Sequence, residues 1–296
     1  MEHPYSVLAP EYNSLLAQMR ITNPAMVRAV ATRLLHFKDR YTQVWAKTGV
    51  PVIELTALNE RESGSDFRTY FGNGDSLTHP TIHVPKHRGP FPSWEAGCID
   101  ALHLDRLDLI ASGGFGSENA GPHGWTWARA CYEAEIFNGF GYRAHNVHSP
   151  YLWAGTNIYS HGKFTSDGHF DPNIGDKQLG CLPLMATLVE LDPSLALIDA
   201  FPAAPLVPRL EHEMIPQPAP VPPGHGADDP AHDTKWIQAS LNELDPDAEL
   251  TVDGIWGRHT RRALMDFQAA HKLDVDGIAG PLTIAAMEEV LQEGVT

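Results

Sequence analysis

Along roughly the first two hundred residues, apolar side chains recur every three or four positions, which is the spacing of one helix face. Glycines and prolines interrupt this pattern between residues 66 and 92, where Thr81–Val84 alternate as in a short strand. We therefore expect a mainly α-helical domain with a small β-hairpin lobe. The pattern predicts helices over 9–19, 23–47, 51–63, 94–109, 125–138 and 176–191.

The predicted helix over 51–63 is the element around which we expect the rest of the domain to be organised. Pro51 suits a first helical turn, because its missing N–H costs nothing there, and Gly64 suits a helix end. Glu62 then lies at the C-terminal end of an apolar-faced helix. The helix dipole and apolar neighbours both oppose an anion there, so we expect Glu62 to keep its proton near neutral pH, as a general acid must. A solvated carboxylate at a helix end is the alternative.

The triplet Arg61-Glu62-Ser63 after an apolar helix resembles the end of the catalytic helix in the lysozyme-like superfamily. Goose-type lysozymes and soluble lytic transglycosylases carry Arg-Glu-Ser or Gln-Glu-Ser there. Further segments within 45–192, such as Asn-Gly-Phe-Gly-Tyr-Arg and Ser-Pro-Tyr-Leu-Trp, are similar to bacterial and phage proteins of the lysozyme family. The resemblance implies a lysozyme-like α+β fold, action on glycan chains and Glu62 as a catalytic residue.

Asp75 and Thr81 repeat a second spacing of the phage-type lysozymes, in which the catalytic Glu is followed by an Asp and, six positions later, a Thr. The resemblance implies that Asp75 and Thr81 hold the nucleophilic water. The step from Glu62 to Asp75 is longer here than in that family. The alternative for Asp75 is a turn-capping role, which Asp side chains commonly take.

Aromatic and amide side chains are dense between residues 138 and 159. Sugars have apolar faces and hydroxyl edges, so rings for stacking beside amides for hydrogen bonding suit an oligosaccharide groove. We expect this run to form a wall of the substrate cleft, although core packing is the alternative for each ring taken singly. The candidates are Asn138, Tyr142, Tyr151, Trp153, Asn157 and Tyr159.

His161, Asp167, His169 and Asp171 are close enough in sequence to be weighed as a zinc site. Zinc peptidases of the D-alanyl-D-alanine type use His and Asp at a different spacing. We therefore expect no metal and no other cofactor. A zinc-dependent peptidoglycan amidase or peptidase is the alternative function.

Prolines dominate residues 202–232, which predicts a semi-rigid, extended linker. The linker divides the chain into a catalytic domain over 1–201 and a C-terminal domain over 233–296.

The C-terminal domain contains an internal repeat, because Val252-Asp253-Gly254 recurs 23 positions later as Val275-Asp276-Gly277. Each copy continues through Gly-x-x-Thr into a predicted helix, and a first helix is expected over 234–244. This pattern resembles the three-helix peptidoglycan-binding module, which implies binding to the bacterial wall. Trp256, in the first turn, is the candidate for ligand contact.

The net charge of −16 argues against nucleic-acid binding, because the phosphate backbone is also negative. The same charge is unusual for an enzyme that acts on the polyanionic wall. Three widely spaced cysteines in apolar surroundings are expected to be buried and unpaired. No signal peptide and no apolar run of membrane-spanning length is readable. We expect a monomer that is made in the cytoplasm and inserts into no membrane.

These features predict a glycosidase that cuts peptidoglycan between N-acetylmuramic acid and N-acetylglucosamine and is anchored by its C-terminal module. We expect a phage or prophage endolysin, which a separate holin would release, or an injected effector. Hydrolysis and lytic transglycosylation both fit the residues.

Overall fold

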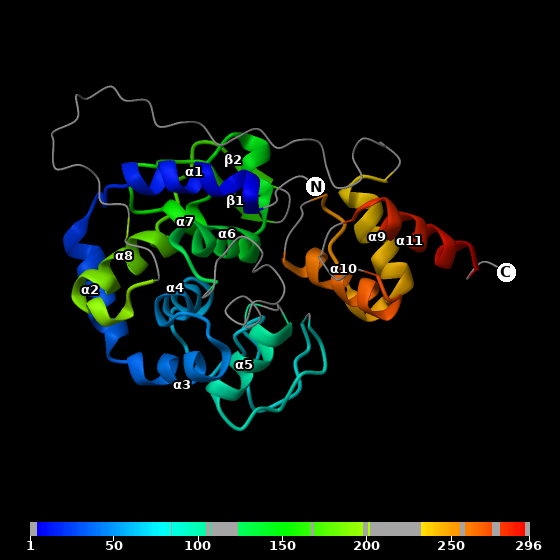
Figure 1. Cartoon of the computed structure of the whole chain (residues 1–296), viewed down its shortest axis with the longest axis horizontal. Coiled ribbons are helices and arrows are strands. Elements are labelled where there is room, and N and C mark those ends of the chain that lie inside the picture. The colour runs from blue at the N-terminus through cyan, green and yellow to red at the C-terminus, as the bar shows by residue number, and fades with distance from the viewer. Residues whose placement is uncertain are drawn as a thin grey trace.

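The computed structural model contains two separate hydrophobic cores, one on each side of the proline-rich segment. The larger core is built from residues between Tyr5 and Leu188, and the smaller one from residues between Ile237 and Met287. Figure 1 shows the two lobes side by side. The structure describes residues 5–83, 85–104, 107, 124–166, 169–197, 201, 232–254, 258–273 and 279–293.

The larger lobe is helical, with α4 near its centre (Figure 1). Helix α4 packs against α3, α6 and α8, and α1 packs along α6. Two 3₁₀ turns, η2 (Phe140–His145) and η3 (Pro193–Leu195), join the later helices. The helices are α1 (Tyr5–Gln18), α2 (Pro24–Leu35), α3 (Lys38–Thr48), α4 (Val52–Ser63), α5 (Trp94–Leu104), α6 (Trp127–Asn138), α7 (Pro150–Trp153) and α8 (Cys181–Leu191).

Helix α4 begins and ends where the sequence predicts, with one difference at its start. Pro51 is the N-cap residue, with extended backbone, and the helical turns follow it. Gly64 ends the helix in the left-handed conformation at φ 63°, which costs a glycine little. All residues from Val52 to Asn59 are buried, so the helix runs through the core and brings only its last turn to the surface.

The single helix predicted over 23–47 is two helices in the structure, α2 and α3. The break falls at His36 and Phe37, where the chain makes a tight turn: the N–H of His36 donates to the carbonyl of Arg33, and that of Phe37 donates to the carbonyl of Leu34. The ring of Phe37 packs 4.9 Å from that of Phe67. Because this contact is with a distant segment, the local spacing of apolar residues does not predict the break.

The β-hairpin lies elsewhere than predicted. It consists of β1 (Lys163–Ser166) and β2 (His169–Asp171), paired antiparallel. Within the described part of 66–92, the strand-like pairing is one isolated bridge between Thr69 and Ser76. Thr81–His83 form no strand, because Thr81 closes a loop on itself: its N–H donates to Arg88 and its carbonyl accepts from His87, each at 2.9 Å.

The C-terminal lobe is a three-helix unit of α9 (Thr234–Leu244), α10 (Arg258–Ala270) and α11 (Pro281–Glu293), with the 3₁₀ turn η5 (Pro246–Ala248). In both repeat copies a buried glutamine donates to the repeat threonine at 3.2 Å, Gln238 to Thr260 and Gln268 to Thr283. The sequence repeat is therefore also a repeat of contacts. Trp256 and the second Asp-Gly turn lie outside the described residues.

Candidate functional site

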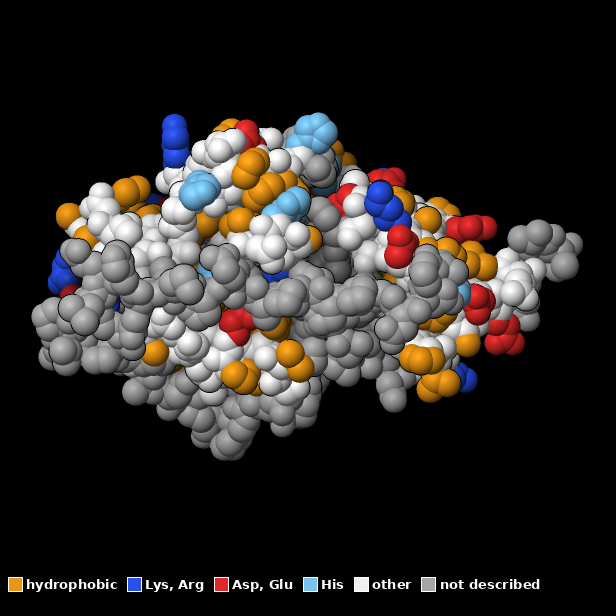
Figure 2. All heavy atoms as spheres, turned by 90° about the horizontal axis from the view of Figure 1, so that it is seen from above, with side chains coloured by type: hydrophobic (Ala, Val, Ile, Leu, Met, Phe, Trp, Pro, Cys, Tyr) orange, Lys and Arg blue, Asp and Glu red, His pale blue; other side chains and the backbone are white. Residues whose placement is uncertain are grey.

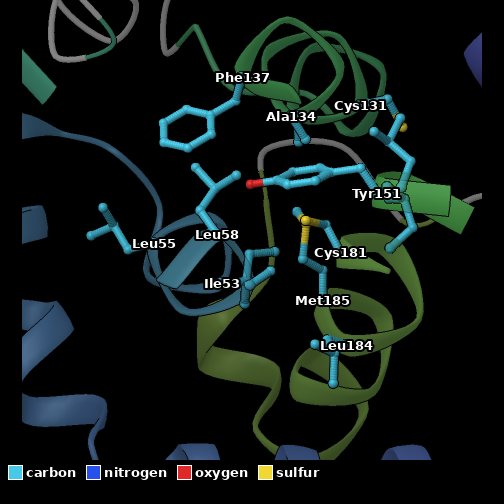
Figure 3. Packing of buried hydrophobic residues seen from close by; sticks show 14 of the residues in the cluster. Ile53, Leu55, Leu58, Cys131, Ala134, Phe137, Tyr151, Cys181, Leu184 and Met185 are labelled. Carbon is cyan, nitrogen blue, oxygen red and sulfur yellow. The ribbon is translucent and has the colours of Figure 1, made fainter. Parts of the chain in front are cut away.

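Glu62 occupies the last turn of α4, where the helix emerges from the core. Its side chain is exposed, so the predicted apolar enclosure is not seen among the described residues. The hydroxyl of Tyr151 donates to Oε1 of Glu62 at 2.7 Å. Figure 3 shows Tyr151 reaching from α7 across the core toward α4, with Ala134 on one side of its ring and Cys181 on the other. A buried phenol therefore orients one oxygen of an exposed carboxylate.

Glu62 lies on a pocket of about 380 Å³. This volume is within the range of small-molecule sites. Most of the wall comes from the end of α4 and the loop that follows it, and the rest comes from the C-terminal lobe. We call this space the Glu62 pocket. Its lining residues are Asn59, Glu62, Ser63, Tyr70, Phe71, Asn73, Gly74, His83, Glu249, Leu250, Thr251 and His259.

The loop over 176–180 fastens the end of α4 that carries Glu62. Gln178 donates its side-chain amide to the backbone carbonyl of Arg61 at 2.7 Å, satisfying one of the carbonyls that a helix end leaves unpaired. Arg61 in turn donates to the carbonyls of Gln178 and Leu179 and forms an ion pair with Asp176. The side chains of Arg61 and Asp176 are only 8% and 2% exposed.

Charges beside Asp176 keep it ionised. Its burial alone would raise its pKa, but Arg61 and the hydrogen bond from Lys163 at 2.9 Å hold the pKa below the ordinary value. The guanidinium of Arg61 also lies 5.1 Å from the centre of the Tyr151 ring. Asp176, Arg61 and Tyr151 thus form one buried contact chain that ends at Glu62.

Gly180 brings the same loop against α7. A Cβ at this position would lie 2.3 Å from the backbone oxygen of Leu152, so only glycine allows the approach. The N–H of Gly180 donates to the carbonyl of Ala154 at 2.8 Å. The loop therefore contacts both the helix that carries Glu62 and the helix that carries Tyr151.

Asp75 lies behind the pocket rather than on its lining. Its Oδ2 accepts from the backbone N–H groups of Ile82 and His83, and its Oδ1 is 2.7 Å from Nδ1 of His83. Partial burial would raise the pKa of Asp75, but these hydrogen bonds outweigh it and hold the pKa below its ordinary value. Asp75 thus fixes the loop that presents His83, which does line the pocket.

Thr81 is also occupied within that loop. It is buried, its hydroxyl donates to the carbonyl of Pro85, and it accepts from the N–H of Arg88 at 3.0 Å. The structure thus brings Asp75 and Thr81 to the same loop but gives both of them loop-closing contacts. Their predicted hold on a nucleophilic water stays a prediction.

Of the six residues predicted to form a substrate wall, the structure brings Tyr151 to Glu62. Trp153, at 1% exposure, lies in the core, and Asn157 ties its own turn to Arg20 and Gln18. Tyr142 and Tyr159 are buried, with their hydroxyls accepting from the N–H groups of Phe164 and Asp176.

Asn138 is exposed at the end of α6 and is not among the lining residues of the Glu62 pocket. Most of the six residues predicted to form the substrate wall therefore pack behind the Glu62 pocket. Their contact with a glycan stays a prediction.

No group of three or more potential metal ligands is close together among the described residues, which include His161, His169 and Asp171. Asp167 lies outside them. Cys98, Cys131 and Cys181 are buried, and none of them forms a disulfide.

Sequence reasoning did not select His83, Asp176, Glu249 or His259. Asp176 pairs with Arg61 across a separation of 115 residues, and such a pairing has no local signal. His83 could have been found from its place in the loop that follows Asp75.

Comparison with known proteins identifies the C-terminal lobe. The family model described as "Putative peptidoglycan binding domain" matches residues 231–287. No curated protein and no solved structure matches the chain.

The chain is thus a peptidoglycan-associated protein, with a C-terminal helical peptidoglycan-binding domain and a helical N-terminal region. None of its described helices is both long and apolar enough to cross a membrane.

Proposed function

We propose that this protein is a peptidoglycan glycosidase in which Glu62 is the general acid. The observation that carries the proposal is the placement of Glu62: it projects from the end of a core helix into a pocket of ligand size, with one oxygen held by Tyr151. The chain also carries a module for the polymer that such an enzyme would cut. The resemblance of Arg61-Glu62-Ser63 to lysozyme-type catalytic helices supports the same role.

In the proposed reaction, a glycan strand lies in the Glu62 pocket and protonated Glu62 donates its proton to the glycosidic oxygen as the C–O bond breaks. In hydrolysis, water then adds to the sugar. In lytic transglycosylation, a hydroxyl of the muramic acid attacks the same carbon and leaves an anhydro end. Both reactions need the proton from Glu62, so both fall under the proposal.

The binding module would keep the enzyme on an insoluble polymer. Once the module is bound, the catalytic lobe meets the strand at the high effective concentration of a tethered partner. The proline-rich segment over 202–232 is long enough in sequence to allow the lobe to reach several strands.

Replacing Glu62 with glutamine tests the proposal. Gln keeps the size and the acceptor for Tyr151 but has no transferable proton, so turnover of purified sacculi should fall by about 10²- to 10⁴-fold. Binding to sacculi, measured by sedimentation, should not change.

The matched control is Glu60→Gln on the same helix, because Glu60 pairs with Arg33 and Ser65 and is not among the pocket-lining residues. It should retain most of the activity, and EDTA should leave the wild-type rate unchanged. Near-normal turnover by Glu62→Gln would remove Glu62 from the mechanism. An EDTA loss restored by zinc would favour an amidase or peptidase.

A further inference from the structure

The Glu62 pocket has a second contributor, the C-terminal module. Glu249, Leu250, Thr251 and His259 line it together with Glu62 and His83. An ion pair joins Glu249 to Lys86, which lies in the loop closed by Thr81. We propose that the module is a reversible wall of the catalytic pocket and that it contacts the same glycan segment that the larger lobe cleaves. This inference rests on the proposed glycosidase function.

The edge of the module that faces the pocket, residues 249–251, is held in place from inside the module. Asn242 of α9 accepts from the N–H of Leu250 at 2.6 Å and donates to its carbonyl at 2.8 Å. Glu249 has a left-handed backbone with φ 40°, which is uncommon for a residue other than glycine and occurs often at functional positions. The edge therefore presents Glu249 in a fixed conformation.

The facing loop of the larger lobe is also well held. Arg88, two positions after Lys86, donates its N–H to the hydroxyl of Thr81. Its guanidinium forms an ion pair with Asp100 of α5. Lys86 thus projects from a braced loop, and Glu249 projects from a braced edge. The contact between the lobes joins two preformed surfaces.

The chemistry of the module side suits a glycan. Glu249 and Thr251 carry oxygen acceptors and His259 carries a ring nitrogen, and such groups can hydrogen-bond sugar hydroxyls. On the opposite side the pocket offers the exposed side chains of Glu62 and His83. A sugar in the pocket would meet polar groups from both lobes.

The ion pair between Lys86 and Glu249 is weak. The side chain of Glu249 is 52% exposed and that of Lys86 is 24% exposed. An ion pair with this much solvent contact shifts an equilibrium by no more than about fivefold. This ion pair therefore does little to oppose release of the module, and an enzyme that admits a long polymer needs such release.

Charge reversal in the full chain tests the inference. Lys86→Glu, Glu249→Lys and the double exchange are each made together with Glu62→Gln, so that the glycan is not cut. Binding of a soluble, peptide-free glycan strand is measured by calorimetry, and the radius of gyration by small-angle X-ray scattering. Lys47→Glu, an exposed charge reversal on α3, is the matched control.

We expect each single variant to raise Kd by about two- to fivefold and to increase the radius of gyration, while the double exchange restores both. An unchanged radius in the single variants, or no restoration by the exchange, overturns the docking. A changed radius with unchanged Kd overturns the shared glycan contact. If no variant and no parent binds the glycan, the proposed function fails, and the scattering still decides whether the module docks.

Discussion

The two sides of the Glu62 pocket are built in opposite ways. On the side of the larger lobe, Arg61 is paired with Asp176 and lies against the ring of Tyr151, all three side chains are buried, and Gln178 caps the helix end. On the module side, a partly exposed ion pair between Lys86 and Glu249 joins the two lobes. Figure 2 shows one face of the two lobes, with acidic side chains gathered over the module at the right of the view.

The buried ion pair and the exposed ion pair differ in how much free energy is lost when each is broken. Breaking a buried ion pair by removing one partner costs about 3 to 5 kcal/mol, whereas an exposed pair contributes at most about 1 kcal/mol. In the proposed enzyme, the first side would hold the Glu62 carboxylate in one place through many turnovers. The second would open and close at little cost, which suits the loading of a polymer.

The largest effect is expected at Asp176. Asp176→Asn leaves the Arg61 guanidinium buried without its carboxylate, so the larger lobe should lose about 3 kcal/mol of unfolding free energy. Turnover should fall with it, because the Arg61–Asp176 ion pair is one of the contacts that hold the loop against α4. The check is urea unfolding followed by the near-ultraviolet circular dichroism of the aromatic core, together with kcat on soluble glycan.

Asp171→Asn, on the neighbouring hairpin, is the control for Asp176→Asn, since the hydrogen bond that Asp171 makes within the described part of the chain is to the backbone N–H of Asn173 in its own turn. Stability equal to that of the wild type in Asp176→Asn would show that the fastening loop contributes nothing to the site.

Tyr151→Phe should change activity while leaving the fold in place. The variant keeps the buried ring but removes the hydroxyl that donates to Glu62. A hydrogen bond to a charged group contributes about 1.5 to 3 kcal/mol, so kcat should fall by about 10- to 100-fold.

Tyr5→Phe is the matched control for Tyr151→Phe, because Tyr5 is also buried and its hydroxyl is hydrogen-bonded to Thr126, away from the lining of the Glu62 pocket. A kcat of Tyr151→Phe equal to that of the wild type would assign Tyr151 to packing alone.

A smaller effect is expected at Glu54, which lies in the buried part of α4. Burial, with a further contribution from Glu133, raises its pKa well above the ordinary value, and neither of its carboxylate oxygens has a hydrogen-bond partner among the described residues. A raised pKa in the folded state means that stability is fully present below the unfolded value of about 4.3 and declines as pH rises toward the folded pKa.

Glu54→Met should remove that decline and stabilise the larger lobe at neutral pH by about 1 to 3 kcal/mol. Hydrogen exchange of the α4 backbone amides at pH 4.5 and pH 7.5 measures both effects. Glu190→Met, at an exposed position, should leave the exchange unchanged. If wild-type protection rose with pH, the assignment of Glu54 as a destabilising buried acid would be wrong.

The parts that local sequence determines were predictable. Pro51 and Gly64 bound α4 as their backbone preferences require, which placed Glu62 at a helix end. The repeat around Gly254 was readable because its turn needs a positive φ, and Gly254 has φ 81°. Within the described residues, each of these features depends on a few neighbouring positions.

The parts that depend on distant contacts were not predictable. Arg61 meets Asp176, and Glu62 meets Tyr151, only after the chain has folded. Thr81 reads as a strand residue because β-branched side chains favour strands, yet its hydrogen bonds to Arg88 and His87 close a loop. The sequence predicts that Trp153 stacks on a sugar, although the fold buries its ring in the core.

The most direct test of the central claim is mass spectrometry of purified peptidoglycan after digestion by the full chain and by Glu62→Gln. We expect fragments cut at the glycosidic bond, ending either in a reducing sugar or in an anhydro sugar lighter by one water. We also expect these fragments to be almost absent from the Glu62→Gln digest. Fragments cut only at amide bonds, or the same glycan fragments in equal amounts from Glu62→Gln, would contradict the claim.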